Sequence, residues 1–435
     1  MNFPVPDMGR RSIARCDILG VAPFSENEDL LNRPYLTSSH RAALERLETW
    51  MIAAGMTVRL DPIGNLIGRY EGQTPGAPAL LIGSHIDTVR DGGRYDGALG
   101  VMLGVETVEA FHRMGKRLPF AIEVIAFGDE EGSRFPASML CSGALARGVD
   151  LEALNLTDED GVTLAQALSD FGLDPSQAPQ AARGRGEVLA YLEAHIEQGP
   201  VLEAEALPIG VVTGIASQLR LKARFIGQAG HAGTTPMRLR RDGLAAATAA
   251  TQAIERICSN GQSDLVGTVG RILTSTSAFN VIVGEAEIGI DLRAGARAVR
   301  DAAAKEIRDA LEDIAQARGV RLEFSIIQDL PDCPCDPRLM GLMDQAVEGT
   351  GVRPYRLMSG AGHDAMALAG LAPVAMLFIR CGGGISHNAA ESVAVDDVEV
   401  AAQAMVGFVE RLAEQTYPAN DPTGQAHLAT VADRT

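Results

Sequence analysis

Apolar runs and amphipathic segments alternate through the first part of the chain. The run at 79–82 (ALLI) predicts a buried strand, apolar residues follow at helical spacing over 97–114, and FAIEVIAF at 120–127 predicts a second buried strand. Alternating residues at 56–60 and 66–70, separated by the turn sequence DPIGN, predict a hairpin before the first of these strands. The order strand, helix, strand favours an α/β sheet.

The segments on either side are less regular. Residues 10–55 are predicted to be helical, because apolar residues recur at helical spacing and Gly55 follows them as a stop signal. Residues 145–185 are polar and are expected to form surface helices and loops. Residues 188–194 predict another strand.

From about residue 211 the pattern changes to strand, helix, strand, strand, helix, strand. This order is the split βαβ, or ferredoxin-like, arrangement, which forms a self-sufficient small domain. The expected elements are the strand 217–226, the helix 239–258, the strands 265–273 and 285–293, the helix 296–317 and the strand 320–327.

The chain then returns to the first type of pattern. A helix is predicted near 337–348, a strand at 373–379 and a final helix ending near residue 415, with 417–435 loosely ordered. A chain of 435 residues exceeds what one hydrophobic core usually serves. We therefore predict two domains, a mixed-sheet α/β domain and an inserted ferredoxin-like α+β domain. Their boundaries are 1–210 with 330–435 for the first, and 211–329 for the second.

Charge and composition disfavour several classes of partner. With 38 basic and 56 acidic residues the formal charge is −18, which disfavours binding to nucleic acid or to anionic membranes. The longest apolar run, 365–379, is interrupted by Gly370 and Pro373 and is too short for a spanning helix. The N-terminus shows no signal-peptide core, and six scattered cysteines fit a reducing compartment, so a cytoplasmic location is expected.

The eight histidines divide into two groups by their sequence context. Three lie on segments predicted to be at the surface: His40, His112 and His427. Five lie in Gly-rich contexts at strand ends: His85, His195, His231, His363 and His387. Taken singly, each of these five is as often a hydrogen-bonded structural residue as a ligand. Nitrogen and oxygen ligands of the kind that hold zinc, manganese or cobalt are offered by His85, Asp96, Glu131, His195 and His387. Two ions sharing one bridging carboxylate suit that count.

Two further acids have roles that the local sequence suggests. His85 and Asp87 lie two residues apart, hence on one face of a strand, so the carboxylate can orient the imidazole. Glu130 and Glu131 follow a buried strand, so one can bind metal while the other accepts a proton from water and returns it to a leaving nitrogen. A solvated acidic loop is the alternative for this pair.

Seven motifs occur in an order that resembles the M20-type metal-dependent amidohydrolases. They are GSHIDTVRDGGRYDGALGV, GDEEGSRF, AHIEQGP, GQAGHAGTTPM, FNVIVGE with IDLRA, SGAGHDAM and GISHNAAE. Within that family the chain looks most similar to allantoate amidohydrolases, N-carbamoyl-L-amino acid hydrolases and β-ureidopropionases. The resemblance runs over 15–410 and implies a di-metal catalytic domain with a ferredoxin-like lid that also forms a homodimer.

The resemblance also assigns roles to the ligands. They divide into two sets: His85, Asp96 and His195 for one ion, and bridging Asp96, Glu131 and His387 for the other. Glu130 would be the general base, and Asp87 would fix the tautomer of His85. Zinc, manganese, cobalt and nickel all suit such ligands, so the identity of the two divalent ions is left open.

The substrate contacts implied by the resemblance lie mostly in the inserted domain. His231 matches the position that polarises the scissile carbonyl, and Asn280 and Arg293 match residues that hold the substrate carboxylate. Gln198 and Arg220 are further candidates. An arginine can grip a carboxylate with two hydrogen bonds, although Arg293 could equally be a surface charge. Lysine and arginine side chains share the face of Arg220, so an ordinary solvated stripe is its alternative.

The expected substrate is therefore a small anionic ureido compound. The expected reaction is hydrolysis of a linear ureido or N-carbamoyl amide that carries a carboxylate, releasing ammonia and carbon dioxide, as in purine and ureide catabolism. Allantoate is the first choice of substrate, N-carbamoyl-L-amino acid hydrolase or β-ureidopropionase activity is the alternative, and acylase or dipeptidase activity comes third. A non-catalytic binding relative is the competing class, which the presence of every ligand and of Glu130 disfavours.

Overall fold

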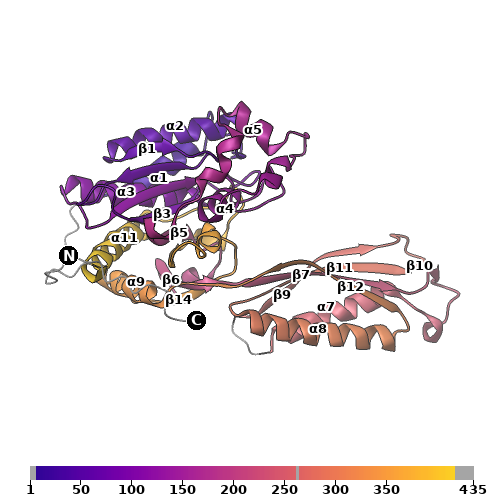
Figure 1. Cartoon of the computed structure of the whole chain (residues 1–435). Coiled ribbons are helices and arrows are strands. Elements are labelled where there is room, and N and C mark those ends of the chain that lie inside the picture. The colour runs from indigo at the N-terminus through magenta and orange to yellow at the C-terminus, as the bar shows by residue number, and fades with distance from the viewer. Residues whose placement is uncertain (1–5, 261–263, 417–435) are drawn as a thin grey trace. The chain divides into compact units, whose positions relative to one another are not determined.

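The computed structural model describes residues 6–260 and 264–416 (Figure 1). The chain forms two compact units. The first contains Met1–Thr213, Cys335–Leu357 and His363–Thr435, and the inserted unit contains Gly214–Pro334 and Met358–Gly362. The short return at 358–362 was not predicted; there the backbone N–H of Ala216 donates to the carbonyl oxygen of Ser359 at 2.9 Å. The prediction for 417–435 lies outside the described residues.

The first unit is built on a mixed sheet with strand order β1-β2-β4-β3-β5-β15-β6, in which β14 also pairs with β6. Strands β3, β4, β5 and β15 run parallel, and the pairs β1–β2, β2–β4 and β15–β6 are antiparallel. The strand bounds are β1 Thr57–Leu60, β2 Leu66–Tyr70, β3 Ala79–His85, β4 Ala121–Phe127, β5 Val188–Ile196, β6 Ile209–Ile215, β14 Arg356–Ser359 and β15 Val374–Ile379. The mixed α/β sheet that the apolar runs predict is confirmed, while β6 and β14 were missed.

Helices surround this sheet. The α-helices are α1 Met8–Leu19, α2 Ser38–Ala53, α3 Ala98–Arg113, α4 Leu140–Arg147, α5 Leu164–Asp170, α6 Val201–Ala204, α9 Pro337–Gly349, α10 Asp364–Leu368 and α11 Val395–Thr416. Short 3-10 helices are η1 Leu151–Asn155, η2 Pro175–Ala181, η3 Arg185–Glu187 and η5 Gly382–Gly384. The polar segment 145–185 thus forms short helices and loops, as its composition predicts.

The prediction of continuous helix over 10–55 is wrong between α1 and α2. Helix α1 ends at Leu19, before Gly20, and Pro23 and Pro34 interrupt the stretch that follows because proline has no N–H to donate. Helix α2 begins anew after Thr37, whose side chain accepts a hydrogen bond from the backbone N–H of His40. Helical spacing alone therefore missed two strong breakers.

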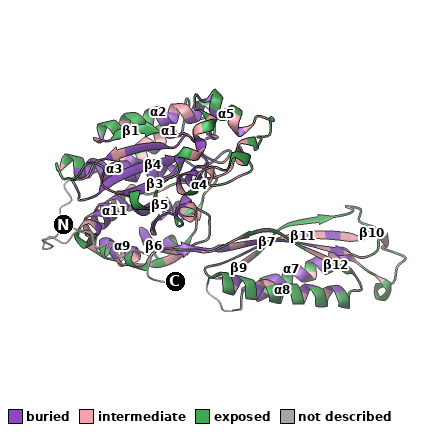
Figure 2. Cartoon of the chain, viewed as in Figure 1, coloured by how far each residue is buried: buried purple, intermediate pink, exposed green. Residues whose placement is uncertain are grey.

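Helix α3 is buried over most of its length against the central strands of the sheet. It packs against β3, β4 and β5 and also against α1 and α11, and every residue from Ala98 to Phe111 is buried. Figure 2 shows the same burial along the central strands β3, β4 and β5. Because α3 is fixed on several sides, the loop that ends at its first residue is fixed as well.

The inserted unit has the split βαβ order that the sequence predicts. Its antiparallel sheet has the order β12-β7-β11-β9, and α7 and α8 lie side by side on one face of it (Figure 1). The bounds are β7 Ser217–Ile226, α7 Gly243–Cys258, β9 Val266–Thr274, β11 Glu285–Ala294, α8 Arg297–Ala317 and β12 Arg321–Leu330. Smaller elements are β8 Gly230–His231, η4 Met237–Leu239, β10 Val281–Ile282 and β13 Cys333–Pro334.

The core of the inserted unit follows from strict alternation along β7. Leu221, Ala223 and Phe225 are buried against the helices, whereas Arg220 and Lys222 on the alternate positions are exposed. Helix α7 begins at Gly243 rather than at residue 239, because the side chain of Asp242 caps it by accepting the N–H of Ala245 at 3.1 Å. Within 6–260 and 264–416, no helix has the length and apolarity needed to cross a bilayer.

Candidate active site

The predicted ligands gather at the carboxyl ends of the parallel strands. His85 is the last residue of β3, Glu130 and Glu131 follow β4, and His195 is near the end of β5. His387 lies on the loop after β15, and Asp96 lies just before α3. The carboxyl edge of parallel strands is where open α/β sheets bind their ligands, because loops from several strands meet there.

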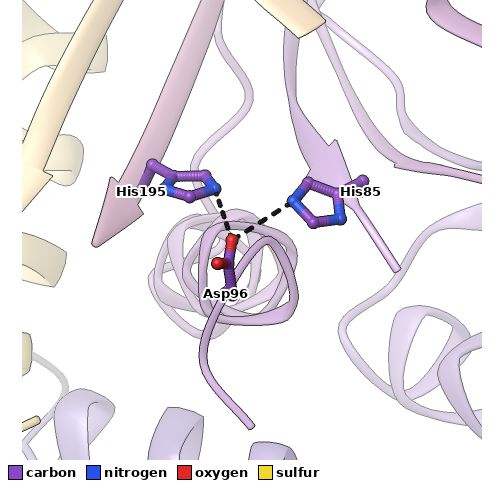
Figure 3. A group of neighbouring side chains, drawn as sticks. All are labelled: His85, Asp96 and His195. Carbon is purple, nitrogen blue, oxygen red and sulfur yellow. Dashed lines mark ion pairs between the residues drawn. The ribbon is translucent and has the colours of Figure 1, made fainter. Parts of the chain in front are cut away.

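Asp96 is the centre of this group. His85 Nε2 and His195 Nε2 lie 3.4 Å and 3.1 Å from Asp96 Oδ1 (Figure 3). His387 Nε2 lies 3.3 Å from the other oxygen, Asp96 Oδ2, and 3.3 Å from Glu131 Oε1. The structure thus brings together two sets that share Asp96: His85, Asp96 and His195, and Asp96, Glu131 and His387. Each set uses a different oxygen of one carboxylate, which is the arrangement of a bridging ligand.

The chemistry of these atoms fits a divalent cation. The Nδ1 atoms of His85 and His195 lie 3.1 Å and 2.9 Å from backbone carbonyl oxygens, so in the neutral rings they carry the proton and the Nε2 lone pairs face Asp96. Asp96 Oδ1 is buried and accepts no hydrogen bond from any described residue. Lone pairs that face one another across about 3 Å repel unless a proton or a metal cation lies between them, and imidazole with carboxylate suits a transition metal.

The raised pKa values of His85 and His387 also show that this group of side chains favours a positive charge. Burial opposes protonation of His85, but the nearby carboxylates of Asp87 and Asp96 raise its pKa well above the usual value. For His387, contacts with Asp96 and Glu131 raise the pKa to about 10. His85 and His195 are almost fully buried, whereas the His387 side chain is 48% exposed, so the second set is the more accessible of the two.

Asp87 is buried next to the predicted ligands and contacts His85, Glu130 and Glu131. Its carboxylate accepts the backbone N–H groups of Glu130 at 3.1 Å and Glu131 at 3.2 Å, and its Oδ1 lies 3.4 Å from His85 Nδ1. Asp87 is fully buried, so these contacts are not shared with water. This geometry suits the orienting role that the sequence suggests for Asp87.

Glu130 and Glu131 differ in their surroundings. Glu131 reaches His387, whereas Glu130 groups with His85 and Glu131. Glu130 is 9% exposed, and burial together with nearby carboxylates raises its pKa well above the usual value. A carboxylate with a raised pKa is a better proton acceptor near neutral pH, which favours Glu130 as the base of the pair.

Glycine is required at the approach of α3 to the ligands. Gly97 has φ +65°, and a Cβ at this position would lie 2.4 Å from His85 Nε2. A side chain here would fill the space beside the imidazole that a cation needs. Gly97 therefore has a direct role in forming the site.

Two residues near Asp96 were not predicted, and one predicted residue takes an unexpected place. The Ser386 hydroxyl donates to Asp96 Oδ2 at 2.5 Å, and Glu391 accepts the backbone N–H of Asp96 at 3.1 Å. Gln198, predicted as a substrate contact, donates to Asp96 Oδ2 at 2.8 Å. Ser386 and Glu391 belong to the same GISHNAAE motif as His387, which was the available signal.

His231 and Asn280 are neighbours in the inserted unit. His231 on β8 pairs with Val281 on β10, and the N–H of Ala232 donates to the carbonyl oxygen of Asn280 at 2.8 Å. The N–H of Gly233 donates to His231 Nδ1 at 3.1 Å, so the proton of the neutral ring is on Nε2. His231 is exposed and therefore presents a hydrogen-bond donor, as an oxyanion requires.

Arg293 is held by an acid that sequence reasoning did not single out. Asp291 accepts Arg293 Nε at 2.7 Å and Arg293 Nη2 at 3.1 Å, and Arg293 Nη1 donates to the carbonyl oxygen of Gly360. A guanidinium has five N–H donors, so one remains on each Nη. Those two donors match the two oxygens of a carboxylate. Arg220 also contacts Asp291, at 3.1 Å, and its side chain is 51% exposed.

The assignment of His40 to the surface is wrong. His40 is fully buried, its Nδ1 accepts the N–H of Leu36 at 3.2 Å, and its ring packs against Tyr35 and Phe171. His112 is exposed as predicted, and His427 lies outside the described residues. His40 lies in the first turn of α2, and its burial depends in part on Phe171, which is distant in the sequence.

Comparison with known proteins identifies the family. Residues 81–411 match the model of peptidase family M20/M25/M40. The chain belongs to this family. An N-carbamoyl-L-amino acid amidohydrolase from Geobacillus stearothermophilus is 42% identical over 384 residues, which cover 88% of this chain and 94% of the relative. A probable allantoate deiminase from Oryza sativa subsp. japonica is 39% identical, with 89% and 86% covered.

Solved structures agree with this assignment. An amidase of the hydantoinase/carbamoylase family from Burkholderia multivorans has a TM-score of 0.86 at 33% identity and covers 93% of this chain and 98% of that chain. The predicted family and fold class are confirmed. This M20-family chain is therefore an enzyme of a metal-dependent hydrolase family, and its relatives are named as amidohydrolases.

Proposed function

We propose that this M20-family enzyme uses two divalent metal ions to hydrolyse a linear ureido or N-carbamoyl amide that carries a carboxylate. The observation that carries the proposal is the Asp96 carboxylate, whose Oδ1 lies within 3.4 Å of His85 Nε2 and His195 Nε2 and whose Oδ2 lies 3.3 Å from His387 Nε2. Glu130 groups with His85 and Glu131 of the same cluster. Water adds to the ureido carbonyl, the C–N bonds break, and the products are an amine, ammonia and carbon dioxide.

The chain's residues divide the work. His85, Asp96 and His195 would hold one ion, and Asp96, Glu131 and His387 the other. When bound, these ions supply Lewis acidity toward the carbonyl and lower the pKa of the attacking water. Glu130 accepts the proton from that water and returns it to the leaving nitrogen.

The inserted unit supplies the substrate contacts in this proposal. The His231 Nε2–H donates to the oxyanion that develops on the substrate carbonyl, because its Nδ1 is already an acceptor for Gly233. Arg293 offers its two remaining Nη donors to the substrate carboxylate, assisted by Asn280, with Arg220 and Gln198 as further contacts. We further propose that the unit acts as a lid and as the surface of a homodimer.

Two substrates are the leading candidates. Allantoate is the first, and relatives named as allantoate deiminases support it, such as the rice protein at 39% identity. An N-carbamoyl-L-amino acid is the second, and the Geobacillus relative at 42% identity favours it. Both compounds carry a terminal ureido group and a carboxylate, so Arg293 serves either one.

One panel of assays tests the proposal. The purified enzyme is stripped with a chelator, reloaded separately with Zn²⁺, Mn²⁺, Co²⁺ or Ni²⁺, and assayed for ammonia release from allantoate, ureidopropionate, ureidoglycolate and several N-carbamoyl-L-amino acids. Metal-dependent ammonia release from at least one of them is expected. Release from N-carbamoyl-L-amino acids but not from allantoate would replace the first choice with the second. Release from none, with metal bound, would refute the reaction class.

A further inference from the structure

Glu391 joins two loops that are far apart in the sequence. It lies on the loop after β15, four residues beyond His387, and is 7% exposed. Its Oε1 accepts the backbone N–H of Tyr95 at 2.8 Å and that of Asp96 at 3.1 Å, across 295 residues for the second bond. Its Oε2 lies 3.2 Å from the Ser386 hydroxyl, which also contacts Asp96 Oδ2.

The loop that carries Asp96 is shaped to hold this carboxylate. A Cβ added at Gly93 would lie 2.0 Å from Glu391 Cδ and 2.2 Å from each of its oxygens, which are the three nearest atoms. Gly93 does not have a positive φ, so its backbone tolerates a side chain and the obstacle is Glu391. The loop therefore wraps closely around a side chain from the opposite end of the first unit's sequence.

A buried carboxylate beside another carboxylate is unfavourable unless its hydrogen bonds compensate. Glu391 and Asp96 are such neighbours, yet the contacts of Glu391 fall on the Asp96 backbone and on the serine that contacts the Asp96 side chain. General stabilisation of the loop would not require a second buried acid beside Asp96. A fixed direction of the Asp96 carboxylate does require firm anchoring of its backbone.

We propose that Glu391 is a positioning residue for the metal centre: it holds the Asp96 backbone and ties the Asp96 loop to the His387 loop. The inference rests on the metal binding proposed above. Residues that support metal ligands from behind typically change metal affinity by about 10- to 100-fold when removed.

The first test measures Zn²⁺ affinity of the full-length protein by competition with a chromogenic chelator. Glu391→Ala should weaken Zn²⁺ binding by about 10- to 100-fold. Glu391→Gln should stay within about threefold of wild type, because the amide oxygen can still accept both backbone N–H groups and the amide NH₂ can face the Ser386 oxygen. If Zn²⁺ affinity falls equally in Glu391→Ala and Glu391→Gln, or falls in neither, the proposed role of the Oε1 contacts is overturned.

A matched control separates positioning from general stability. Asp61 is also buried, at 2% exposure, and its Oδ1 accepts two backbone N–H groups, from Ile63 at 3.0 Å and Asn65 at 2.8 Å, in the turn between β1 and β2. Asp61→Ala should lower the urea midpoint of unfolding without changing Zn²⁺ affinity. Equal losses of affinity in Asp61→Ala and Glu391→Ala would mean that Glu391 acts only through stability.

The second test does not depend on the folding of Glu391→Ala. Gly93→Ala should displace Glu391 and weaken Zn²⁺ binding about as much as Glu391→Ala does. When Gly93→Ala is added to Glu391→Ala, the added methyl group should lower Zn²⁺ affinity by less than about threefold. A Gly93→Ala variant with wild-type affinity would overturn the inference. A wild-type protein that binds no Zn²⁺ would instead refute the proposed metal site itself, so the two failures are distinguishable.

Discussion

Replacing Asp87 with alanine tests how the ligands are oriented. The substitution removes the acceptor for the N–H groups of Glu130, which is buried, and Glu131, which is half-buried, on the loop after β4. Leaving a buried N–H unpaired costs about 1–3 kcal/mol, so the two together should lower the free energy of unfolding by about 2–6 kcal/mol.

The effect on metal affinity should be smaller than these contacts suggest. His85 Nδ1 lies 3.4 Å from the Asp87 carboxylate, but it is also 3.1 Å from the Asp87 backbone carbonyl, which alanine retains. The ring thus keeps its tautomer in Asp87→Ala, and we expect a loss near the lower end of the usual range, about tenfold or 1.4 kcal/mol. Turnover per bound metal should also fall, because the backbone of Glu130 loses its anchor.

Urea unfolding of the metal-free protein and Zn²⁺ competition provide the two measurements. Asp87→Asn should be intermediate, because its amide oxygen can accept one N–H while its NH₂ faces the other donor. Asp91 is an exposed acid on the same loop, so Asp91→Asn is the matched control. It should match wild type in both the free energy of unfolding and the Zn²⁺ affinity. The reasoning is refuted if the free energy of unfolding of Asp87→Ala lies within about 0.5 kcal/mol of the wild-type value, because ordinary surface substitutions change stability by about that much.

Three further predictions concern the base, the carboxylate clamp and pH. Glu130→Gln should retain bound metal but lower kcat by about 10²- to 10⁴-fold, and ammonia release at wild-type rate would exclude Glu130 as the base. Arg293→Lys should raise KM for a carboxylate substrate by about tenfold or more with a smaller change in kcat, since lysine cannot make the paired contact; steady-state kinetics with a decarboxylated substrate analogue, equally poor for both enzymes, is the control. Burial, with the nearby Arg33, lowers the pKa of His40 to about 3, so the unfolded state takes up a proton first as the pH falls below about 6.5 and stability is lost from there toward pH 3. By pH 5 the free energy of unfolding should have fallen by about 2 kcal/mol. The variant His40→Asn, which keeps an acceptor for the N–H of Leu36, should not show this fall. If the two proteins differ in free energy of unfolding by the same amount at pH 7 and at pH 5, the prediction is contradicted.

Strands were predictable where local burial dictates composition. The buried parallel strands β3, β4 and β15 are covered on both faces and so must be apolar along their whole length, which marks them in any reading of the sequence. Strands β7 and β11 are covered on one face, and their period of two is equally visible. The five residues predicted as ligands stand out for a related reason, because each lies at a strand end or beside glycines.

Contacts between distant segments could not be predicted in the same way. The places of Glu391 and Gln198 beside Asp96 depend on which loops meet once the sheet has formed. The burial of His40 likewise depends on rings brought from elsewhere. Periodicity reports the surroundings of a residue within its own element, whereas the partner of a side chain is set by chain folding over hundreds of residues. The residues proposed as metal ligands, and the local pair His85 and Asp87, could therefore be predicted from the sequence, whereas the contacts of Glu391 and Ser386 with Asp96 are visible only in the folded chain.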